Sequence, residues 1–187
     1  MIKGHNMNTK KKNGFTIIEV VLVLAIAGLI FLMVFIALPA LQRSQRDTQR
    51  DSDIARAMAA VTSFQKVNRN RVPEFGVEGA RAWGSCDPVD ADGFCGRYLL
   101  VAGTDGNTVD TFEDPDGTPY MFVDGGAAVA GGAGTEPRAW SNEDDRHRIF
   151  VHTNATCDGE DAVPSSGARK IAFRYALEGG GIICSSN

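Results

Sequence analysis

The chain has 187 residues, 43% of them hydrophobic, and a formal net charge of −4, which suits one domain of ordinary size with an additional extended element. Its hydrophobic residues are concentrated between Phe15 and Leu41, and the rest of the chain is Gly-rich with a modest apolar content. Residues 1–14 hold four lysines and no acidic residue, so their removal takes the net charge from −4 to −8, which argues against a nucleic-acid-binding domain because such domains usually present a basic surface.

The first predicted element is a membrane-spanning helix at residues 20–38, which contain no charged residue. Nineteen residues at 1.5 Å each cover about 28 Å, close to the hydrocarbon thickness of a bilayer. A secretory signal peptide would have a shorter apolar core followed by a cleavage site of small residues, whereas Pro39 and a polar stretch follow here. A plain signal anchor fits the length and the lysines at positions 10–12, which would hold the N-terminus in the cytoplasm.

Glu19 is an acidic residue inside the otherwise apolar run FTIIEVVLVLAIAG. An ionised carboxylate at this depth in a membrane is costly and usually has a partner, which a plain signal anchor does not provide. Cleavage between Gly14 and Phe15 would create an α-amine on Phe15 that is positively charged at neutral pH. That amine would lie four residues from Glu19 on the same helix, or would pair with Glu19 of a neighbouring helix in an assembly.

The segment Lys11-Lys12-Asn13-Gly14-Phe15-Thr16-Ile17-Ile18-Glu19 resembles the prepilin motif of type IV pilins and type II secretion pseudopilins. The resemblance implies that residues 1–14 are a leader, and that a membrane aspartyl prepilin peptidase cuts after Gly14 and N-methylates Phe15. It also implies that Glu19 acts in assembly with other pilin subunits at an inner-membrane assembly platform. The expected location is the cytoplasmic (inner) membrane, with a single pass and the N-terminus inside, and then an extracellular pilus or a periplasmic pseudopilus.

Residues 42–71 are predicted to continue the hydrophobic helix of residues 15–41, because no Gly or Pro occurs between Pro39 and Pro73. Residues 42–53 are polar on all sides, which predicts a solvated or bundle-facing helix rather than one packed on a core. An apolar stripe with three- and four-residue steps then predicts docking on the globular domain; it consists of Ile54, Met58, Val61, Phe64 and Val67. Together, residues 15–71 would form one helix of 57 residues, about 85 Å long.

Residues 72–187 are predicted to form a β-rich globular domain in the periplasm or outside the cell. A loop rich in Gly, Asp and Pro comes first, at 72–96, and strand-like runs follow at 97–102, 119–123, 148–152 and 170–177. In the last run, one face is predicted to present Ile171, Phe173, Tyr175 and Leu177. The glycines at 179–181 then turn the chain into a hairpin. The pattern predicts an α+β, pilin-like fold, in which the long N-terminal helix packs on a small antiparallel sheet of about four strands.

All four cysteines lie in this domain, and an even count in an exported region suggests two disulfide bonds. They are Cys86, Cys95, Cys157 and Cys184, and three pairings are possible. The pairing Cys86–Cys95 with Cys157–Cys184 is favoured because each pair flanks one local segment. Four free thiols are the alternative. A zinc site is disfavoured because the chain has no C-x-x-C, and because His147 and His152 would lie on opposite faces of a strand.

The segment Asp114-Pro115-Asp116-Gly117-Thr118-Pro119-Tyr120 resembles the Asp-Pro-x-Gly-x-Pro-Tyr turn of major pilins and pseudopilins. Some pseudopilins of this type bind calcium, so the resemblance makes Asp114 and Asp116 weak calcium candidates. No segment has the full calcium loop of an EF-hand, however. Because Asp-Gly is above all a turn signal, the first expectation is that the protein has no cofactor.

The sequence contains none of the hydrolase, metalloprotease or phosphate-loop motifs that would indicate an enzyme, and His147 has no nucleophile context beside its neighbours Asp144 and Asp145. We therefore expect a non-enzymatic structural subunit of a type IV pilus-like filament with no direct nucleic-acid partner. The alternatives are a type II secretion pseudopilin or, from a different class, a membrane-anchored extracellular binding domain or hydrolase. The sequence separates neither a major from a minor subunit nor adhesion, motility and DNA uptake from one another.

Overall fold

The computed structural model divides the chain into two units, one that extends to Leu41 and one that runs from Gln42 to Asn187. The predicted leader before Gly14 and most of the predicted loop at 72–96 lie outside the residues that the structure describes. The described residues are 14–73, 86, 94–102, 108–128, 137, 146–167 and 169–187.

One helix, α1 (Ile17–Val67), contains both the predicted membrane span and the predicted amphipathic segment. Its large apolar side chains up to Leu41 are exposed. Pro39 lies inside the helix, where the missing N–H removes the hydrogen bond to the carbonyl four residues earlier. Among the described residues, α1 is the one helix that is long and apolar enough to cross a membrane.

The C-terminal end of α1 comes at Val67 and not at the predicted residue 71. Arg69 and Asn70 have positive φ angles of 53° and 60°, and the N–H of Asn70 donates to the carbonyl of Gln65 at 2.7 Å. These features are those of a Schellman cap. The predicted end was wrong because Arg69 holds the left-handed position at which a glycine usually marks the end of a helix in the sequence.

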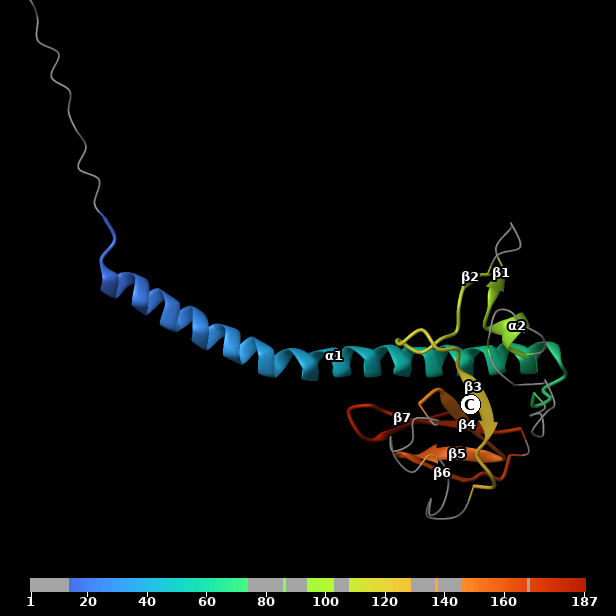
Figure 1. Cartoon of the computed structure of the whole chain (residues 1–187). Helices are drawn as coiled ribbons and strands as arrows, with labels where there is room; N and C mark the ends of the chain where they lie inside the picture. Colours follow the sequence, from blue (N-terminus) through green and yellow to red (C-terminus); the bar gives the residue numbers. More distant parts are fainter. Residues whose placement is uncertain are drawn as a thin grey trace, which may run out of the picture. The chain divides into compact units, whose positions relative to one another are not determined.

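The main sheet has four strands in the order β3-β4-β7-β8 (Figure 1). β4 (Arg148–Thr153) pairs antiparallel with β7 (Ile171–Ala176), which pairs antiparallel with β8 (Ile182–Ser186). β3 (Met121–Asp124) runs parallel to β4, so this pairing differs from the predicted antiparallel arrangement. Parallel neighbours need a crossover connection of a dozen or more residues, and residues 125–147 are long enough to provide one.

Two short strand pairs lie outside the main sheet: β1 (Val101–Ala102) with β2 (Thr108–Asp110), and β5 (Ala155–Asp158) with β6 (Asp161–Pro164). The segment 97–102 was predicted as one strand, but it begins as the end of helix α2 (Phe94–Tyr98), and only its last two residues form β1. A helical turn places residues four apart on the same side. The rings of Phe94 and Tyr98 accordingly both lie beside Phe64 of α1, with centroid distances of 6.0 and 5.5 Å.

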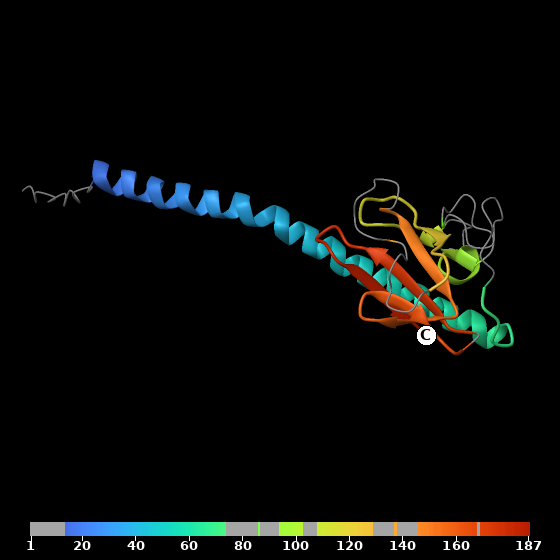
Figure 2. The same cartoon turned by 90° about the horizontal axis from the view of Figure 1, so that it is seen from below.

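The hydrophobic core lies between the second part of α1 and one face of the main sheet (Figure 2). Ile54, Met58 and Val61 are buried and Phe64 is partly buried, which confirms most of the predicted stripe. Val67, in contrast, is 74% exposed. The sheet contributes alternate residues of β4 and β7, because side chains alternate between the two faces of a strand; they are Ile149, Val151, Ile171, Phe173 and Tyr175.

The opposite face of the sheet is covered as well. All six residues of β7 are buried, whereas the alternation in the sequence had predicted one buried face. Ala172 of β7 packs with Ala155 and Ala162 of the β5–β6 pair. Arg174 is also buried on this face, where its Nε donates to the carbonyl of Glu160 at 2.8 Å and its Nη2 lies 3.2 Å from Oδ1 of Asp161.

Candidate functional site

The residues of the predicted processing site lie directly before the first helical residue. Gly14, Phe15 and Thr16 are not helical, and α1 begins at Ile17. The carbonyl of Thr16 accepts a hydrogen bond from the N–H of Val20 at 3.3 Å, so Thr16 is the N-cap residue. The Gly14–Phe15 peptide therefore lies outside the helix.

Nothing in the described part of the chain requires a glycine at position 14. A Cβ atom built on Gly14 meets no atom within 4 Å, and its φ angle lies outside the left-handed region. A side chain at this position would therefore cost the fold little. A requirement for Gly14 would have to come from a partner whose atoms approach the backbone closely, a situation in which glycine is favoured.

Glu19 has hydrogen-bond partners within its own helix. Its Oε2 accepts the backbone N–H of Thr16 at 2.9 Å and the Thr16 hydroxyl at 2.8 Å, and the Oγ1 of Thr16 accepts the N–H of Glu19 at 3.4 Å. This reciprocal arrangement is a capping box, in which Thr16 is the N-cap and Glu19 the third helical residue. Thr16 was not predicted as a partner of Glu19, although the spacing T-x-x-E is the known signature of this cap.

The apolar side chains that follow Glu19 have no cover within the unit that extends to Leu41. Phe31 is 65% exposed, Phe35 75% and Ile36 73%. An apolar surface of this kind is not stable in water and requires lipid or other protein surfaces around it. Glu19 is the one acidic residue between Phe15 and Leu41, which singles it out within this surface.

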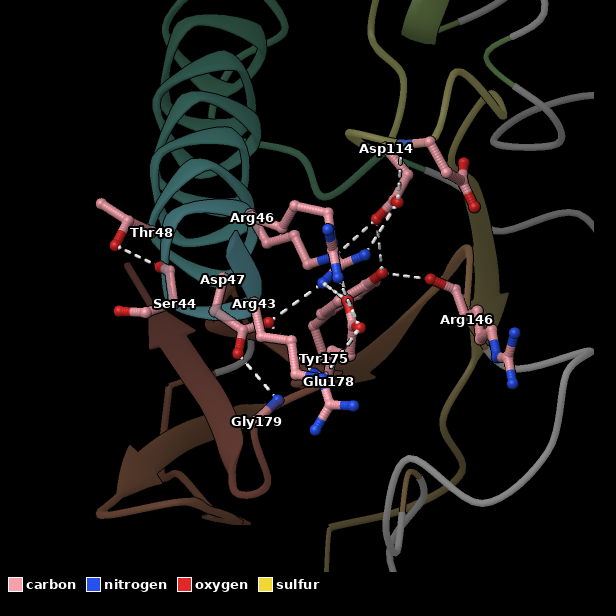
Figure 3. A network of polar contacts seen from close by, with 12 residues as sticks. Arg43, Ser44, Arg46, Asp47, Thr48, Asp114, Arg146, Tyr175, Glu178 and Gly179 are labelled. Carbon is pink, nitrogen blue, oxygen red and sulfur yellow. Dashed lines mark hydrogen bonds and ion pairs between the residues drawn. The ribbon is translucent and has the colours of Figure 1, made fainter. Parts of the chain in front are cut away.

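A buried ion pair connects α1 with the turn before β3 in the unit that begins at Gln42. Arg50 is 2% exposed and Asp114 is 1% exposed. The Nε of Arg50 lies 2.6 Å from Oδ2 of Asp114, and Nη2 lies 2.9 Å from Oδ1. Tyr175 of β7 donates its hydroxyl to Oδ2 of the same carboxylate at 3.1 Å (Figure 3).

The surroundings of Arg50 keep its guanidinium charged. Burial by itself lowers the pKa of the Arg50 guanidinium, but the hydrogen bond and the negative charge of Asp114 outweigh this effect and raise the pKa above its ordinary value. Burial raises the pKa of the Tyr175 hydroxyl, and the charge of Asp114 raises it further. Tyr175 therefore stays protonated and able to donate to Asp114.

Glu178, in the turn between β7 and β8, makes a second charged contact with α1 (Figure 3). Its carboxylate accepts Nε of Arg46 at 2.8 Å and Nη2 at 2.6 Å, and this hydrogen bonding lowers the pKa of Glu178. Asp47 accepts the backbone N–H groups of Glu178 and Gly179 at 3.0 and 2.8 Å. The prediction that residues 42–53 do not pack on the domain was therefore wrong, because charged side chains make this contact.

The calcium candidates Asp114 and Asp116 lie near His147, and one ligand atom from each of the three residues falls within 4.8 Å of the others. Both oxygens of Asp114 are already bonded to Arg50, and Oδ1 also accepts the N–H of Asp116 at 3.2 Å. Oδ1 of Asp116 accepts the N–H of Thr118 at 2.9 Å. Calcium requires six to eight oxygen ligands, so these contacts fit a hydrogen-bonded turn better than a calcium site.

His147 was the residue considered for a catalytic role. Its Nε2 lies 3.6 Å from Oδ2 of Asp116, whose side chain is 46% exposed, and a polar contact of this kind at the surface requires no catalytic role. Its sequence neighbours Asp144 and Asp145 lie outside the described residues.

The structure joins Cys86 to Cys95 and Cys157 to Cys184, which is the pairing that the sequence favoured. Cys86 and Cys95 are fully buried in the main core. The second disulfide links β5 to β8 and so connects the β5–β6 pair to the edge of the main sheet. The first bond thus joins Cys86 to helix α2 within the core, and the second fastens the β5–β6 pair to the main sheet.

The comparison with protein families bears on the N-terminal part of the chain. The model of the prokaryotic N-terminal methylation motif matches residues 9–35, which contain the Gly14–Phe15 peptide, the capping box and much of the apolar part of α1. Comparisons with curated proteins and with solved structures found no significant match. The motif and the apolar helix together support a membrane-anchored protein with a part outside the cytoplasm. The chain thus carries the prokaryotic N-terminal methylation motif, which is the signature of prepilin-like proteins of the type IV pilin and pseudopilin class.

Proposed function

We propose that this chain is the precursor of a structural subunit of a type IV pilus-like filament, and that prepilin peptidase cuts it after Gly14 and N-methylates Phe15. The observation that carries the proposal is the position of Glu19. It is the one acidic residue in an exposed apolar helix, and it lies one helical turn from the residue that cleavage would make the new N-terminus.

Cleavage would give Glu19 a charged partner of opposite sign. A free α-amine has a pKa of about 8 and is positively charged at neutral pH. Both the amine and the Glu19 carboxylate are costly in hydrocarbon, and pairing reduces that cost. A pair formed between two subunits would also fix the register in which their helices pack, because a displaced neighbour would leave both charges unpaired.

The other parts of the chain support the same function. The exposed apolar side chains before Leu41 would lie in the inner membrane before assembly and against other subunits in the filament. The unit that begins at Gln42 would form the exported surface, stabilised by its two disulfides. The partners would be other subunits, prepilin peptidase and an inner-membrane assembly platform, and no enzymatic step is assigned to the chain itself.

The proposal is tested by isolating filaments from the native strain and determining the N-terminus of this subunit by mass spectrometry. We expect a methylated Phe15 as the first residue, and a Gly14→Val variant that accumulates as the full-length precursor. We expect Glu19→Ala to be processed and folded but missing from filaments, whereas the exposed Glu160→Ala serves as a control and assembles normally. Normal assembly of Glu19→Ala would refute the role of Glu19.

Filament isolation together with a gene deletion in the same strain distinguishes a pilin from a type II secretion pseudopilin, since both classes carry this motif. The two disulfides and the size of the exported unit favour a pilin. We therefore expect the subunit in filaments on the cell surface, and we expect deletion of its gene to leave protein secretion intact. A secretion defect without surface filaments would identify a pseudopilin.

A further inference from the structure

We infer that Thr16 is a positioning residue for assembly: its capping box holds the Glu19 carboxylate at the N-terminus of α1 and leaves one carboxylate oxygen for the amine of another subunit. This inference rests on the proposed function. It assigns a role to a side chain that is neither at the cleaved peptide nor part of the proposed ion pair.

The hydrogen bonds on the Glu19 carboxylate are unevenly distributed between its two oxygens. Both bonds from Thr16, through its N–H and its hydroxyl, go to Oε2 of Glu19. No hydrogen bond to Oε1 is present among the described residues. Glu19 can therefore keep its cap through Oε2 and accept an ammonium group at Oε1 at the same time, so the cap and the intersubunit pair are compatible.

An ionised Glu19 carboxylate is costly in the membrane before the amine of another subunit pairs with it. An isolated charge in hydrocarbon tends to be neutralised by a proton, and a neutral acid would attract an ammonium group much less. The cap supplies two donors to Glu19 and places it where the positive end of the helix dipole favours an anion. The monomer can thus maintain the charge that assembly uses.

Thr16 holds the Glu19 carboxylate in place through polar contacts rather than through packing. In a full N-terminal cap, the residue before the N-cap also packs on the fourth helical residue, and these positions are Phe15 and Val20. Phe15 is 88% exposed, so the aromatic ring adds little to the cap. The position of Glu19 therefore depends mainly on the hydroxyl and the backbone of Thr16.

The test uses the full-length protein, both in its native strain and reconstituted in phospholipid nanodiscs. Thr16→Val keeps the shape of the side chain and removes the hydroxyl, whereas Thr16→Ser keeps the hydroxyl. The matched control is Thr48→Val, since Thr48 is an exposed threonine on the same helix and its hydroxyl donates to the carbonyl of Ser44 at 2.8 Å. Loss of a cap should make amide hydrogen exchange at Ile17–Val20 about fivefold faster or more.

We expect Thr16→Val to show this faster exchange and to enter filaments at least about fivefold less than the wild type, in line with the loss of the cap. Thr16→Ser and Thr48→Val should behave as the wild type does. If Thr16→Val assembles normally, or if Thr16→Ser is as defective as Thr16→Val, the positioning role is wrong. Circular dichroism of each variant checks that the exported unit remains folded.

Glu19→Gln separates this inference from the proposed function. A glutamine keeps the capping box, because its side-chain oxygen can accept the same hydrogen bonds, but it has no charge. We expect Glu19→Gln to keep slow exchange at Ile17–Val20 and to lose assembly. Normal assembly of Glu19→Gln would overturn the charge pairing in the proposed function, whereas normal assembly of Thr16→Val with defective Glu19→Gln would overturn the positioning role alone.

Discussion

Replacing Asp114 with asparagine removes the charge that faces the Arg50 guanidinium in the interior of the unit that begins at Gln42. The side chains of Arg50 and Asp114 are 3% and 0% exposed, and two hydrogen bonds of 2.6 and 2.9 Å join them. In Asp114→Asn the guanidinium stays buried and keeps only part of its charge compensation: its Nη1 still lies 3.0 Å from Oδ1 of Asp47 and 3.4 Å from Oε2 of Glu178. Loss of the fully buried partner is destabilising, because the two remaining carboxylates compensate only in part for the hydration that the guanidinium lost on folding.

The expected loss is roughly 3 kcal/mol of the free energy of unfolding, the low end of the range found when one partner of a buried ion pair is removed, because Asp47 and Glu178 still contact the guanidinium. A domain of this size changes its melting temperature by roughly 2–4 °C for each kcal/mol. The melting temperature of Asp114→Asn should therefore fall by roughly 6–12 °C. The double variant Arg50→Met with Asp114→Leu removes both charges together, so it should lose much less than the two single variants combined.

The assay is thermal unfolding of the mature protein in detergent micelles, followed by near-ultraviolet circular dichroism with both disulfides intact. Asp51→Asn is the matched control, because Asp51 is exposed on the same helix, and its melting temperature should stay within about 1–2 °C of the wild type. A loss below about 1 kcal/mol for Asp114→Asn, or additive losses in the double variant, would refute the reasoning about the buried pair.

Three further predictions concern pH, packing and calcium. Hydrogen bonding from Arg46 lowers the pKa of Glu178 in the folded chain below its ordinary value of 4.5. The contribution of Glu178 to stability is therefore complete above pH 4.5 and is lost as the pH falls through the lower folded pKa. The unfolding midpoints of the wild type and Glu178→Gln should converge in acid, and a difference that stays constant with pH would contradict this. A Cβ atom at Gly125 would lie 2.4 Å from the ring of the buried His152. Gly125→Ala should therefore lower the free energy of unfolding, measured by chemical denaturation, by about 1–3 kcal/mol. The control is Gly28→Ala, where a Cβ atom meets nothing within 4 Å, and it should leave the unfolding midpoint unchanged. Because the Asp114 carboxylate is already paired with Arg50, added calcium should not raise the melting temperature, and a rise that EDTA reverses would show a calcium site.

The N-terminal part of the chain was predictable because its signals are local. The apolar run, the Gly14–Phe15 peptide and Glu19 lie within one short stretch of sequence, and the family match falls on the same residues. The strand runs of β4 and β7 were also recognised, since alternation and β-branched residues are properties of the segment itself. Thr16 could have been included on the same basis, because a capping box is a local pattern.

Contacts between segments distant in sequence were not predictable in the same way, and these contacts shape the unit that begins at Gln42. A row of charged residues around Arg50 is typical of a solvated helix, and only the position of Asp114, far along the chain, turns it into a buried contact. The helical start of the segment 97–102 depends on the rings of Phe94 and Tyr98 meeting Phe64. In both cases the partner is distant in sequence, and a periodic pattern carries no information about it.

By itself, the sequence determined that this protein has a prepilin-type methylation motif, an apolar helix with one carboxylate, and an α+β unit that follows it. These features depend on hydrophobicity and spacing within single segments, where backbone geometry alone sets which side chains share a face. Only the tertiary structure decided that β3 pairs parallel to β4, that both faces of β7 are covered, and that Arg50 is buried beside Asp114. Those outcomes depend on which segments pack together, since burial, desolvation and pairing are properties of the assembled neighbours rather than of one stretch of chain.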